Sequence, residues 1–89
     1  MSRTVYLDAR RLQERREAHD YLSRMLSLPS YYGKNLDALE DCLSEMTALR
    51  LVILHEEEGT EPYSYRSKIL HVMEESAAQN PGIRFERRI

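Results

Sequence analysis

The chain has 89 residues, of which 42% are hydrophobic and 31% charged, and its formal net charge is −2. This length allows one domain with a modest core, expected over residues 1–89, and the composition excludes a largely disordered chain. No apolar stretch approaches the roughly 20 residues of a membrane span, and no signal-peptide pattern follows Met1, so we expect a cytoplasmic protein with no membrane partner.

The charges are unevenly distributed along the chain. Residues 34–61 carry eight acidic and two basic residues, whereas both ends are mildly basic. Because phosphate contacts need a basic surface, this pattern favours a basic protein partner over nucleic acid. The single cysteine, Cys42, cannot form an internal disulfide, which fits a reducing compartment, and we expect it to be a small packing residue rather than a nucleophile.

Hydrophobic periodicity predicts six regular elements and one irregular segment. In chain order we expect a strand over 4–7, a helix over 12–27 ended by Pro29, a helix over 36–46, a strand over 49–55, a loop or short irregular helix over 56–65, a helix from 65 to the Asn80-Pro81-Gly82 stop, and a strand over 83–86. The four consecutive aliphatic residues from Leu51 to Leu54 are typical of a strand buried on both faces between helices. This order predicts the α/β class, with a three-stranded parallel sheet and about three to four helices.

The first helix should present an apolar face to the core. The residues that fall near this face are Leu12, Ala18, Tyr21, Leu22, Met25 and Leu26. His19 has no acid–base partner nearby in the sequence, so we expect it at the surface or at the boundary of the core.

The segment from Leu28 to Leu43, LPSYYGKNLDALEDCL, combines a loop with the start of a helix. Asn35 is placed to cap that helix through its side-chain oxygen. An apolar stripe follows (Leu36, Leu39, Leu43, Met46), and beside it an acidic stripe (Asp37, Asp41, Glu45) flanked by Glu40. Since like charges four residues apart slightly destabilise a helix, two interpretations stand: a solvated face, or negative charge presented to a partner.

Two tyrosines precede this helix. Tyr31 is farther from the helix and is expected to be exposed, whereas Tyr32 could lie in the core or at an interface. Tyrosine is enriched among the residues that dominate interface energies. Gly33 allows a positive φ or a close backbone approach.

No enzymatic constellation emerges from the sequence. The three histidines lie in different elements, and none has metal-ligand spacing with Cys42. Asp37 and Asp41 are the only pair that resembles an acid–base dyad, and both should lie on an exposed helix face. We therefore expect a protein that is not an enzyme, with no catalytic residues, no metal site and no cofactor.

The Tyr31–Leu39 run, followed by Asp41-Cys42-Leu43, resembles the signature of the barstar family of ribonuclease inhibitors. The resemblance implies a three-stranded parallel sheet packed with helices, and a loop and helix that plug the active site of a secreted, basic, guanyl-specific ribonuclease or of a nuclease toxin. It also implies an immunity-type inhibitor whose carboxylates stand in for RNA phosphates, and we expect the free protein to be a monomer.

The resemblance also assigns roles to single residues. Asp41 matches the aspartate that enters the phosphate-binding site, Asp37 its acidic neighbour and Tyr31 the interface tyrosine. The remaining partner-binding residues are Gly33, Asn35 and Leu36 in the backbone-contacting segment, Glu75 late in the last helix, and the acidic Glu40 and Glu45.

Three positions depart from the family pattern. Glu40 stands where the family often has tryptophan, Lys34 where barstar has glutamate, and Met46 replaces an aromatic residue. These departures keep an alternative open, in which the chain is a barstar-fold interaction or regulatory module that binds no nuclease.

Overall fold

Three parallel strands form one sheet in the order β1-β2-β3. In the computed structural model, which describes residues 3–56 and 64–88, these strands are β1 (Arg3–Asp8), β2 (Leu49–Leu54) and β3 (Ile83–Arg87). The central strand β2 pairs on both sides, with Leu51 opposite Val5 and Phe85. The predicted α/β class and the central place of the aliphatic strand are confirmed.

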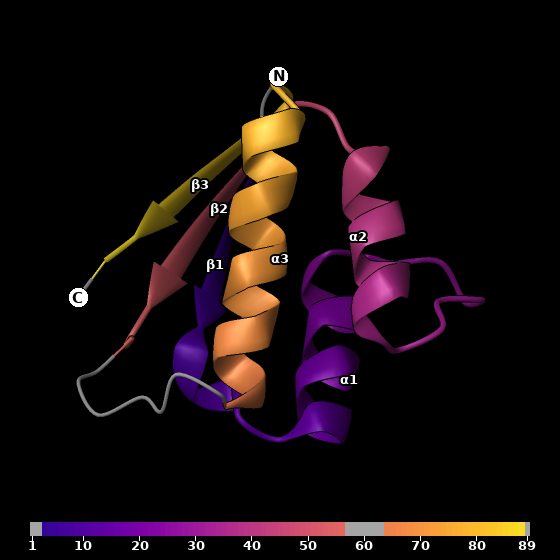
Figure 1. Ribbon diagram of the computed structural model, residues 1–89, viewed down its shortest axis with the longest axis vertical. Helices are drawn as coiled ribbons and strands as arrows, with labels where there is room; N and C mark the ends of the chain where they lie inside the picture. The colour runs from indigo at the N-terminus through magenta and orange to yellow at the C-terminus, as the bar shows by residue number, and fades with distance from the viewer. Residues whose placement is uncertain (1–2, 57–63, 89) are drawn as a thin grey trace.

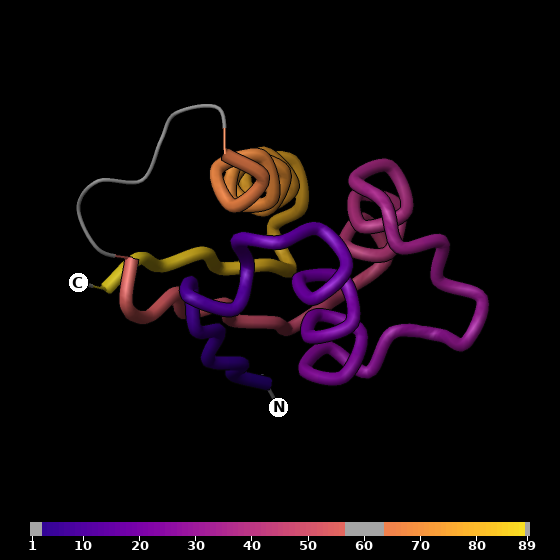
Figure 2. The backbone as a smooth tube through the Cα atoms, turned by 90° about the horizontal axis from the view of Figure 1, so that it is seen from below, coloured from indigo at the N-terminus to yellow at the C-terminus, as the bar shows by residue number. Residues whose placement is uncertain are grey.

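The helices occupy one side of this sheet. They are α1 (Arg15–Met25), α2 (Leu36–Ser44) and α3 (Tyr65–Gln79), and a 3-10 turn, η1 (Ala9–Leu12), follows β1. α3 lies along the sheet with α1 and α2 beside it (Figure 1), and the view from below places all three on the same side (Figure 2). The predicted burial of β2 on both faces is confirmed by Leu51, Val52 and Ile53, but within the described ranges helices lie on one side only, which differs from the expected helical cover.

The core lies between the helices and the near face of the sheet. Fully buried side chains from every element except β3 meet there, among them Leu7, Leu12, Leu22, Leu39, Leu43, Leu51, Ile53, Ile69, Leu70 and Met73, and β3 adds the buried Ile83. Val52 is also fully buried, yet alternation along the strand places it on the helix-free face, between Tyr6 and Glu86 in the register. Among the described residues, no helix lies over Val52, and its register partners Tyr6 and Glu86 flank it.

The first helix is shorter than predicted at its start. Leu12 belongs to η1, and α1 begins only at Arg15. The Glu14 carboxylate accepts hydrogen bonds from the amides of Arg16 and Glu17, at 3.1 and 2.8 Å. This cap fixes the start of α1 because it satisfies donors that no preceding turn can bond.

The end of α1 also differs from the prediction. The helix ends at Met25, before Pro29, and Ser27 takes a left-handed conformation with φ of 52°. Met25 is 39% exposed, so its predicted place on the apolar face was wrong, whereas Leu26 is buried as expected.

Most of the loop predicted over 56–65 lies outside the described residues, and α3 begins at Tyr65 as expected. Among the helices of residues 3–56 and 64–88, none combines the length and the apolar character needed to cross a membrane.

Candidate functional site

The loop enters α2 through a local network of hydrogen bonds. Asn35 is the N-cap, as predicted, and its Oδ1 atom accepts from the Ala38 amide at 2.7 Å. Its Nδ2 atom donates to the Gly33 carbonyl at 3.3 Å. A Cβ at Gly33 would lie 3.3 Å from Asn35 Nδ2 and 3.4 Å from Ala38 Cβ, so this position favours glycine because the backbone passes close to both. The loop and the helix are therefore held in one geometry.

α2 separates an apolar side from an acidic side. Leu39 and Leu43 are fully buried, and Leu36 and Met46 pack partly buried against the core. The opposite side, which we call the acidic face, consists of Asp37, Glu40, Asp41 and Glu45, and all four are exposed. Within residues 3–56 and 64–88, no basic side chain forms an ion pair with any of them. The acidic stripe is therefore not neutralised by those parts of the chain.

The two loop tyrosines point to different environments. Tyr31 is 85% exposed, as expected, whereas Tyr32 is 7% exposed and belongs to the core cluster. The Tyr32 hydroxyl lies 2.6 Å from Nδ1 of His19, and the hydroxyl of Tyr65 bonds the other ring nitrogen. The sequence left the place of Tyr32 open, and the structure places it in the core, whereas Tyr31 is exposed to solvent.

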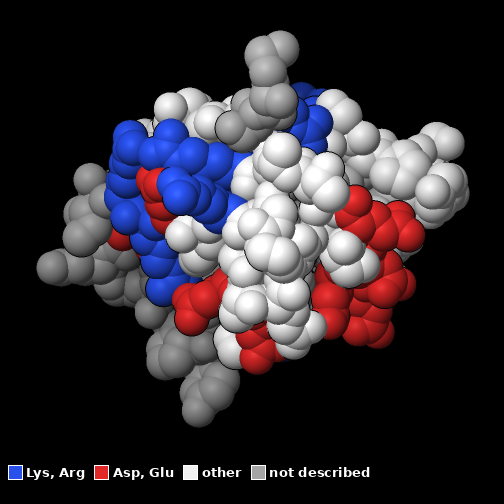
Figure 3. Space-filling model, turned by 90° about the horizontal axis from the view of Figure 1, so that it is seen from above, with Lys and Arg blue, Asp and Glu red and all other residues white. Residues whose placement is uncertain are grey.

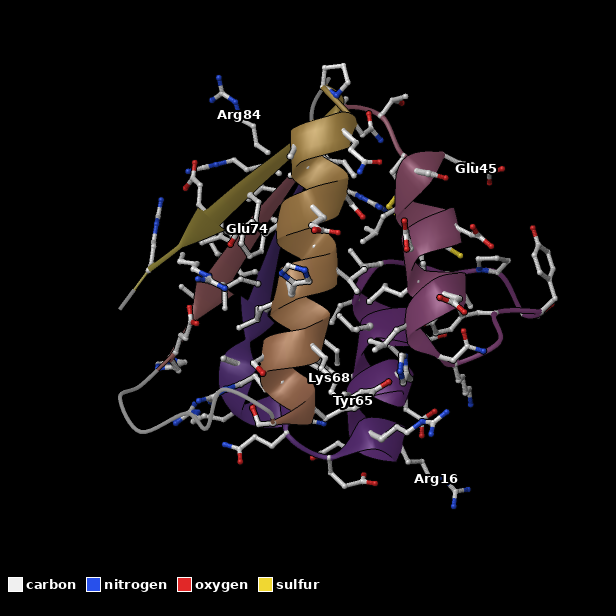
Figure 4. All side chains as sticks on the ribbon, viewed as in Figure 1. Arg16, Glu45, Tyr65, Lys68, Glu74 and Arg84 are labelled. Atoms are coloured by element: carbon white, nitrogen blue, oxygen red, sulfur yellow. The ribbon has the colours of Figure 1, made fainter. Side chains whose placement is uncertain are left out.

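His19 corrects a prediction. It is 1% exposed rather than at the surface or the core boundary, and its two hydrogen-bond partners come from the loop and from α3, 13 and 46 residues away in the sequence. Burial lowers the pKa of this imidazole, and burial raises the pKa of Tyr32. Tyr65 lies at the start of α3 on the side toward α1 (Figure 4). His19 of α1 therefore connects the loop that precedes α2 with α3.

Lys34 does not oppose the acidic face. Its Nζ atom lies 2.8 Å from Oδ1 of Asp20 on α1, and this hydrogen bond lowers the pKa of the Asp20 carboxyl. Lys34 has a left-handed φ of 55°, which directs the chain into the Asn35 cap. The positive charge that Lys34 places where barstar has glutamate is therefore paired with Asp20 of α1, and not with the acidic face.

A groove of about 520 Å³ runs between the loop and α2. It is lined by Ser27, Leu28, Pro29, Tyr31, Asp41, Cys42, Glu45 and Met46. Apolar groups thus lie beside two carboxylates, an arrangement that suits the stem and head of a long cationic side chain. Cys42 is half-buried against the core, and burial raises the pKa of its thiol, as expected for a packing residue.

The remaining predicted contact, Glu75, comes from another element. It lies on the exposed side of α3, and its Oε1 atom is 3.2 Å from Nε2 of His71, one turn earlier. α3 packs against α2, so Glu75 extends the acidic residues onto the neighbouring helix rather than lying among them.

Charged side chains are unevenly distributed over the face seen from above. In the view of Figure 3, acidic side chains gather over α2, and a group of Lys and Arg side chains lies at the opposite edge of the molecule, over the sheet. In the part of the chain that the structure describes, no three His, Cys, Asp or Glu side chains come together as metal ligands do. The sequence also gave no signal for the burial of Arg66, which is 5% exposed in the first turn of α3.

Comparison with known proteins places the chain in a family. The family model described as barstar, the barnase inhibitor, matches residues 2–87. The chain is also 36% identical over 77 residues to the Bacillus subtilis (strain 168) protein named "Putative ribonuclease inhibitor YrdF", a match that covers 83% of this chain and 85% of that protein. The resemblance seen in the loop and helix therefore extends over nearly the whole sequence, and the chain belongs to the barstar family.

Proposed function

We propose that this protein is a cytoplasmic, immunity-type inhibitor of a basic guanyl-specific ribonuclease of the secreted kind, or of a nuclease toxin. The observation that carries the proposal is the acidic face, whose four exposed carboxylates have no ion-pair partner in the described chain and stand beside the exposed Tyr31. Membership of a family described as barnase inhibitors supports it.

The inhibitor acts by occupying the active site of the enzyme. The loop and α2 enter the cleft, and the carboxylates take the places of RNA phosphates. Asp41 meets the cationic groups of the phosphate-binding site, with Asp37, Glu40 and Glu45 around it and Glu75 on the adjoining helix. Tyr31 provides a rigid contact, and Gly33, Asn35 and Leu36 form the segment whose backbone meets the enzyme. A single domain spanning residues 1–89, monomeric when free and without metal or cofactor, is sufficient for this mechanism.

Charge and shape contribute differently to such a complex. Opposite potentials on the two proteins accelerate encounter and select the partner, as the complex of barnase and barstar illustrates. Once the carboxylates are inside the cleft, each desolvated charge needs its partner. Removing one carboxylate leaves a cation buried and unpaired, a loss of roughly 2–5 kcal/mol that appears mainly in the dissociation rate.

The experiment is a titration of nuclease activity with the purified protein. Barnase and any nuclease encoded beside this gene serve as targets, with wild type, Asp41→Ala and Glu17→Ala as inhibitors. Glu17 is an exposed acid of α1 that pairs with Arg11, so its removal changes the net charge equally but leaves the acidic face intact. We expect stoichiometric inhibition, a large loss in Asp41→Ala and little change in Glu17→Ala.

Two outcomes would count against this proposal. Tight inhibition that survives Asp41→Ala would refute the plug mechanism. Absence of binding to either nuclease would favour the alternative of a regulatory module, for which the acidic Glu40 in place of an aromatic residue is the remaining sequence argument.

A further inference from the structure

The end of α2 lacks the groups that usually complete a helix. The last carbonyl groups of a helix have no partner within it, and a glycine just beyond the helix or a basic side chain in its last turn commonly satisfies them. α2 ends at Ser44 with Glu45 as its C-cap, no basic residue lies in its last turn, and Met46 follows instead of glycine. The carbonyl groups at this end therefore depend on a donor from another part of the chain.

Asn80 provides this donor. Its Nδ2 atom donates to the carbonyl oxygens of Leu43 and Met46, at 3.0 and 2.9 Å, and lies 3.4 Å from that of Ser44. Asn80 is the C-cap of α3, and α2 and α3 end at the same end of the molecule (Figure 1). A single side chain, 34 to 37 residues further along the chain, thus bonds both the last turn of α2 and the turn that leads to β2.

The side chain of Asn80 is itself held in one orientation. Its Oδ1 atom accepts from the Gly82 amide at 2.9 Å. The backbone amide of Asn80 donates to the Ser76 carbonyl at 2.8 Å, and its backbone carbonyl accepts from the Ile83 amide at 3.0 Å. A flipped carboxamide would set its oxygen against carbonyl groups, so these contacts also decide which of its two atoms is the donor. Every polar group of Asn80 therefore has a partner.

Gly82 brings the two turns into direct backbone contact. A Cβ at this position would lie 3.0 Å from the Cα of Thr47 and 3.1 Å from the Met46 carbonyl oxygen, so a side chain here would push the turns apart. The Gly82 carbonyl also accepts from the Leu49 amide at 2.8 Å. We call Asn80 and Gly82 together the clasp, because they fasten the end of α2 to the turn that follows α3.

The clasp holds the backbone of one wall of the groove beside Tyr31. Glu45 and Met46 form this wall, and neither residue of the clasp lines the groove. Glu45 is exposed and has no ion pair among the described residues. The backbone of the last turn therefore decides where the Glu45 carboxylate stands.

We propose that Asn80 is a positioning residue for nuclease binding, which acts by holding the last turn of α2 so that Glu45 and Met46 stand where the enzyme meets them. The inference rests on the proposed function, in which Glu45 is one of the contacts. A preformed site binds more tightly because its parts need no ordering at the moment of association. Without the clasp the last turn frays, and affinity is lost although no contact residue has changed.

Two variants remove the donor and keep the turn. Asn80→Ser retains an acceptor for the Gly82 amide, because serine supports the same kind of turn, but it lacks the NH2 group that bonds the carbonyls of α2. Asn80→Asp retains the turn and the shape of the side chain and presents a carboxylate in place of the donor. Gln79→Ser, which removes an exposed carboxamide one residue earlier, is the matched control.

The first test needs no nuclease. Backbone order parameters of the free protein are measured by NMR relaxation. In both Asn80 variants we expect those of Glu45 and Met46 to fall from the rigid range near about 0.85 toward the flexible range below about 0.6. The amide of Leu39, earlier in α2, should stay rigid, and Gln79→Ser should resemble the wild type. Unchanged values at Glu45 and Met46, or an equal fall at Leu39, would overturn the proposal.

The second test compares dissociation from barnase and from any nuclease encoded beside this gene, at a temperature at which circular dichroism shows every variant to be folded. Both Asn80 variants should dissociate roughly three- to tenfold faster than the wild type, the range expected for one lost hydrogen bond, and Gln79→Ser should not. Dissociation is compared because an added charge mainly alters association. A wild-type rate in Asn80→Ser would show that the turn alone is sufficient and would overturn the proposal.

A double-mutant cycle distinguishes positioning from a merely structural role. Glu45→Gln should accelerate dissociation of the wild-type complex about fivefold or more, and it should have little further effect in Asn80→Ser, because the carboxylate is no longer held in place. A merely structural Asn80 would lower the melting temperature when replaced and leave the effect of Glu45→Gln unchanged. Additive effects, or no effect of Glu45→Gln on the wild type, would overturn the proposal.

The outcomes separate this inference from the proposed function. Inhibition lost in Asp41→Ala but unchanged in both Asn80 variants would leave the inhibitor mechanism standing and overturn the role of Asn80. A wild-type protein that inhibits no nuclease would refute the proposed function and with it the binding role of Asn80, whereas the order parameters would still show whether Asn80 holds the last turn of α2.

Discussion

The acidic face of α2 and the helix-free face of the sheet both carry charged side chains, but they use them differently. On the sheet, Arg50 forms a two-pronged contact with Glu86, at 2.9 and 2.8 Å, beside the fully buried Val52. On α2, the carboxylates have no ion-pair partner among the described residues. Arg84 on β3 projects away from the helices, and Glu45 projects outward from the end of α2 (Figure 4).

This difference distinguishes charge that stabilises the fold from charge available to a partner. The Arg50–Glu86 pair lies on the same face as Val52 and next to it in the register, where no helix of the described residues lies, and the apolar stems of such side chains help to exclude water. The acidic face slightly destabilises the free protein, because its like charges repel one another along the helix. Substitutions in the two regions should therefore have different consequences.

The largest effect is expected beneath the paired charges. Val52→Asp places a carboxylate in a fully buried site next to Glu86, which should cost several kcal/mol out of a typical total of about 5–15 kcal/mol. Much of the population should unfold, as followed by circular dichroism. Thr4→Asp, on the same face but exposed, is the control and should change little. An unchanged melting temperature in Val52→Asp would contradict the burial of this strand.

The burial of His19 should make the free energy of unfolding depend on pH. Burial holds the pKa of His19 below its ordinary 6.5, so the unfolded chain takes up a proton before the folded protein does. The free energy of unfolding should fall as the pH drops through about 6.5 toward the folded pKa, by at most about 1.4 kcal/mol per pH unit. Urea unfolding between pH 7.5 and 5.5 measures this slope. His71→Gln, at an exposed site, should retain it, and a flat wild-type profile would contradict the burial of His19.

A smaller effect is expected from breaking the pair on the sheet. Arg50→Ala leaves the Glu86 carboxylate without its closest partner and uncovers Val52, so the melting temperature should fall by a few degrees. Arg84→Ala is the matched control, because Arg84 is exposed on the same face and has no ion pair in the described residues. If both variants melted alike, the charges of the sheet would contribute nothing to stability.

The smallest effect is expected on the acidic face. Asp41→Ala should change the free energy of unfolding of the free protein by about 0.5 kcal/mol or less, because the side chain is exposed and unpaired. Differential scanning calorimetry of the free protein measures it. A loss of several kcal/mol would make Asp41 a structural residue and would end the contrast between the two faces.

Features set by neighbouring residues could be predicted from the sequence. The Asn35 cap, the exposed side of α2 and the aliphatic β2 all follow from patterns spanning a few positions. The end of α3 at Gln79, before Asn80-Pro81-Gly82, is equally local. In these segments short-range propensity and burial favour the same structure, which is why the pattern was sufficient.

Features that depend on residues far apart in the sequence could not be predicted. His19 bonds Tyr32, 13 residues away, and Tyr65, 46 residues away, so no local pattern shows that it is buried. The end of α2 is likewise held by Asn80, whose Nδ2 atom donates to the Leu43 carbonyl at 3.0 Å from 37 residues along the chain. Likewise, four consecutive aliphatic residues predict burial on both faces but do not say whether a helix or a pair of charges provides it.

The length of α2 has a consequence for anyone wishing to copy the site. The helix has nine residues, fewer than the roughly 12–15 at which an isolated helix becomes even marginally stable in water. Its shape depends on the burial of Leu39 and Leu43. It also depends on Asn80, far along the chain, whose Nδ2 atom donates to the Leu43 carbonyl. A synthetic peptide of residues 28–46 would carry nearly every proposed contact and yet lose the conformation that aligns them. Miniaturised mimics of this inhibitor will therefore need a staple or a grafted scaffold to replace what the remainder of the chain supplies.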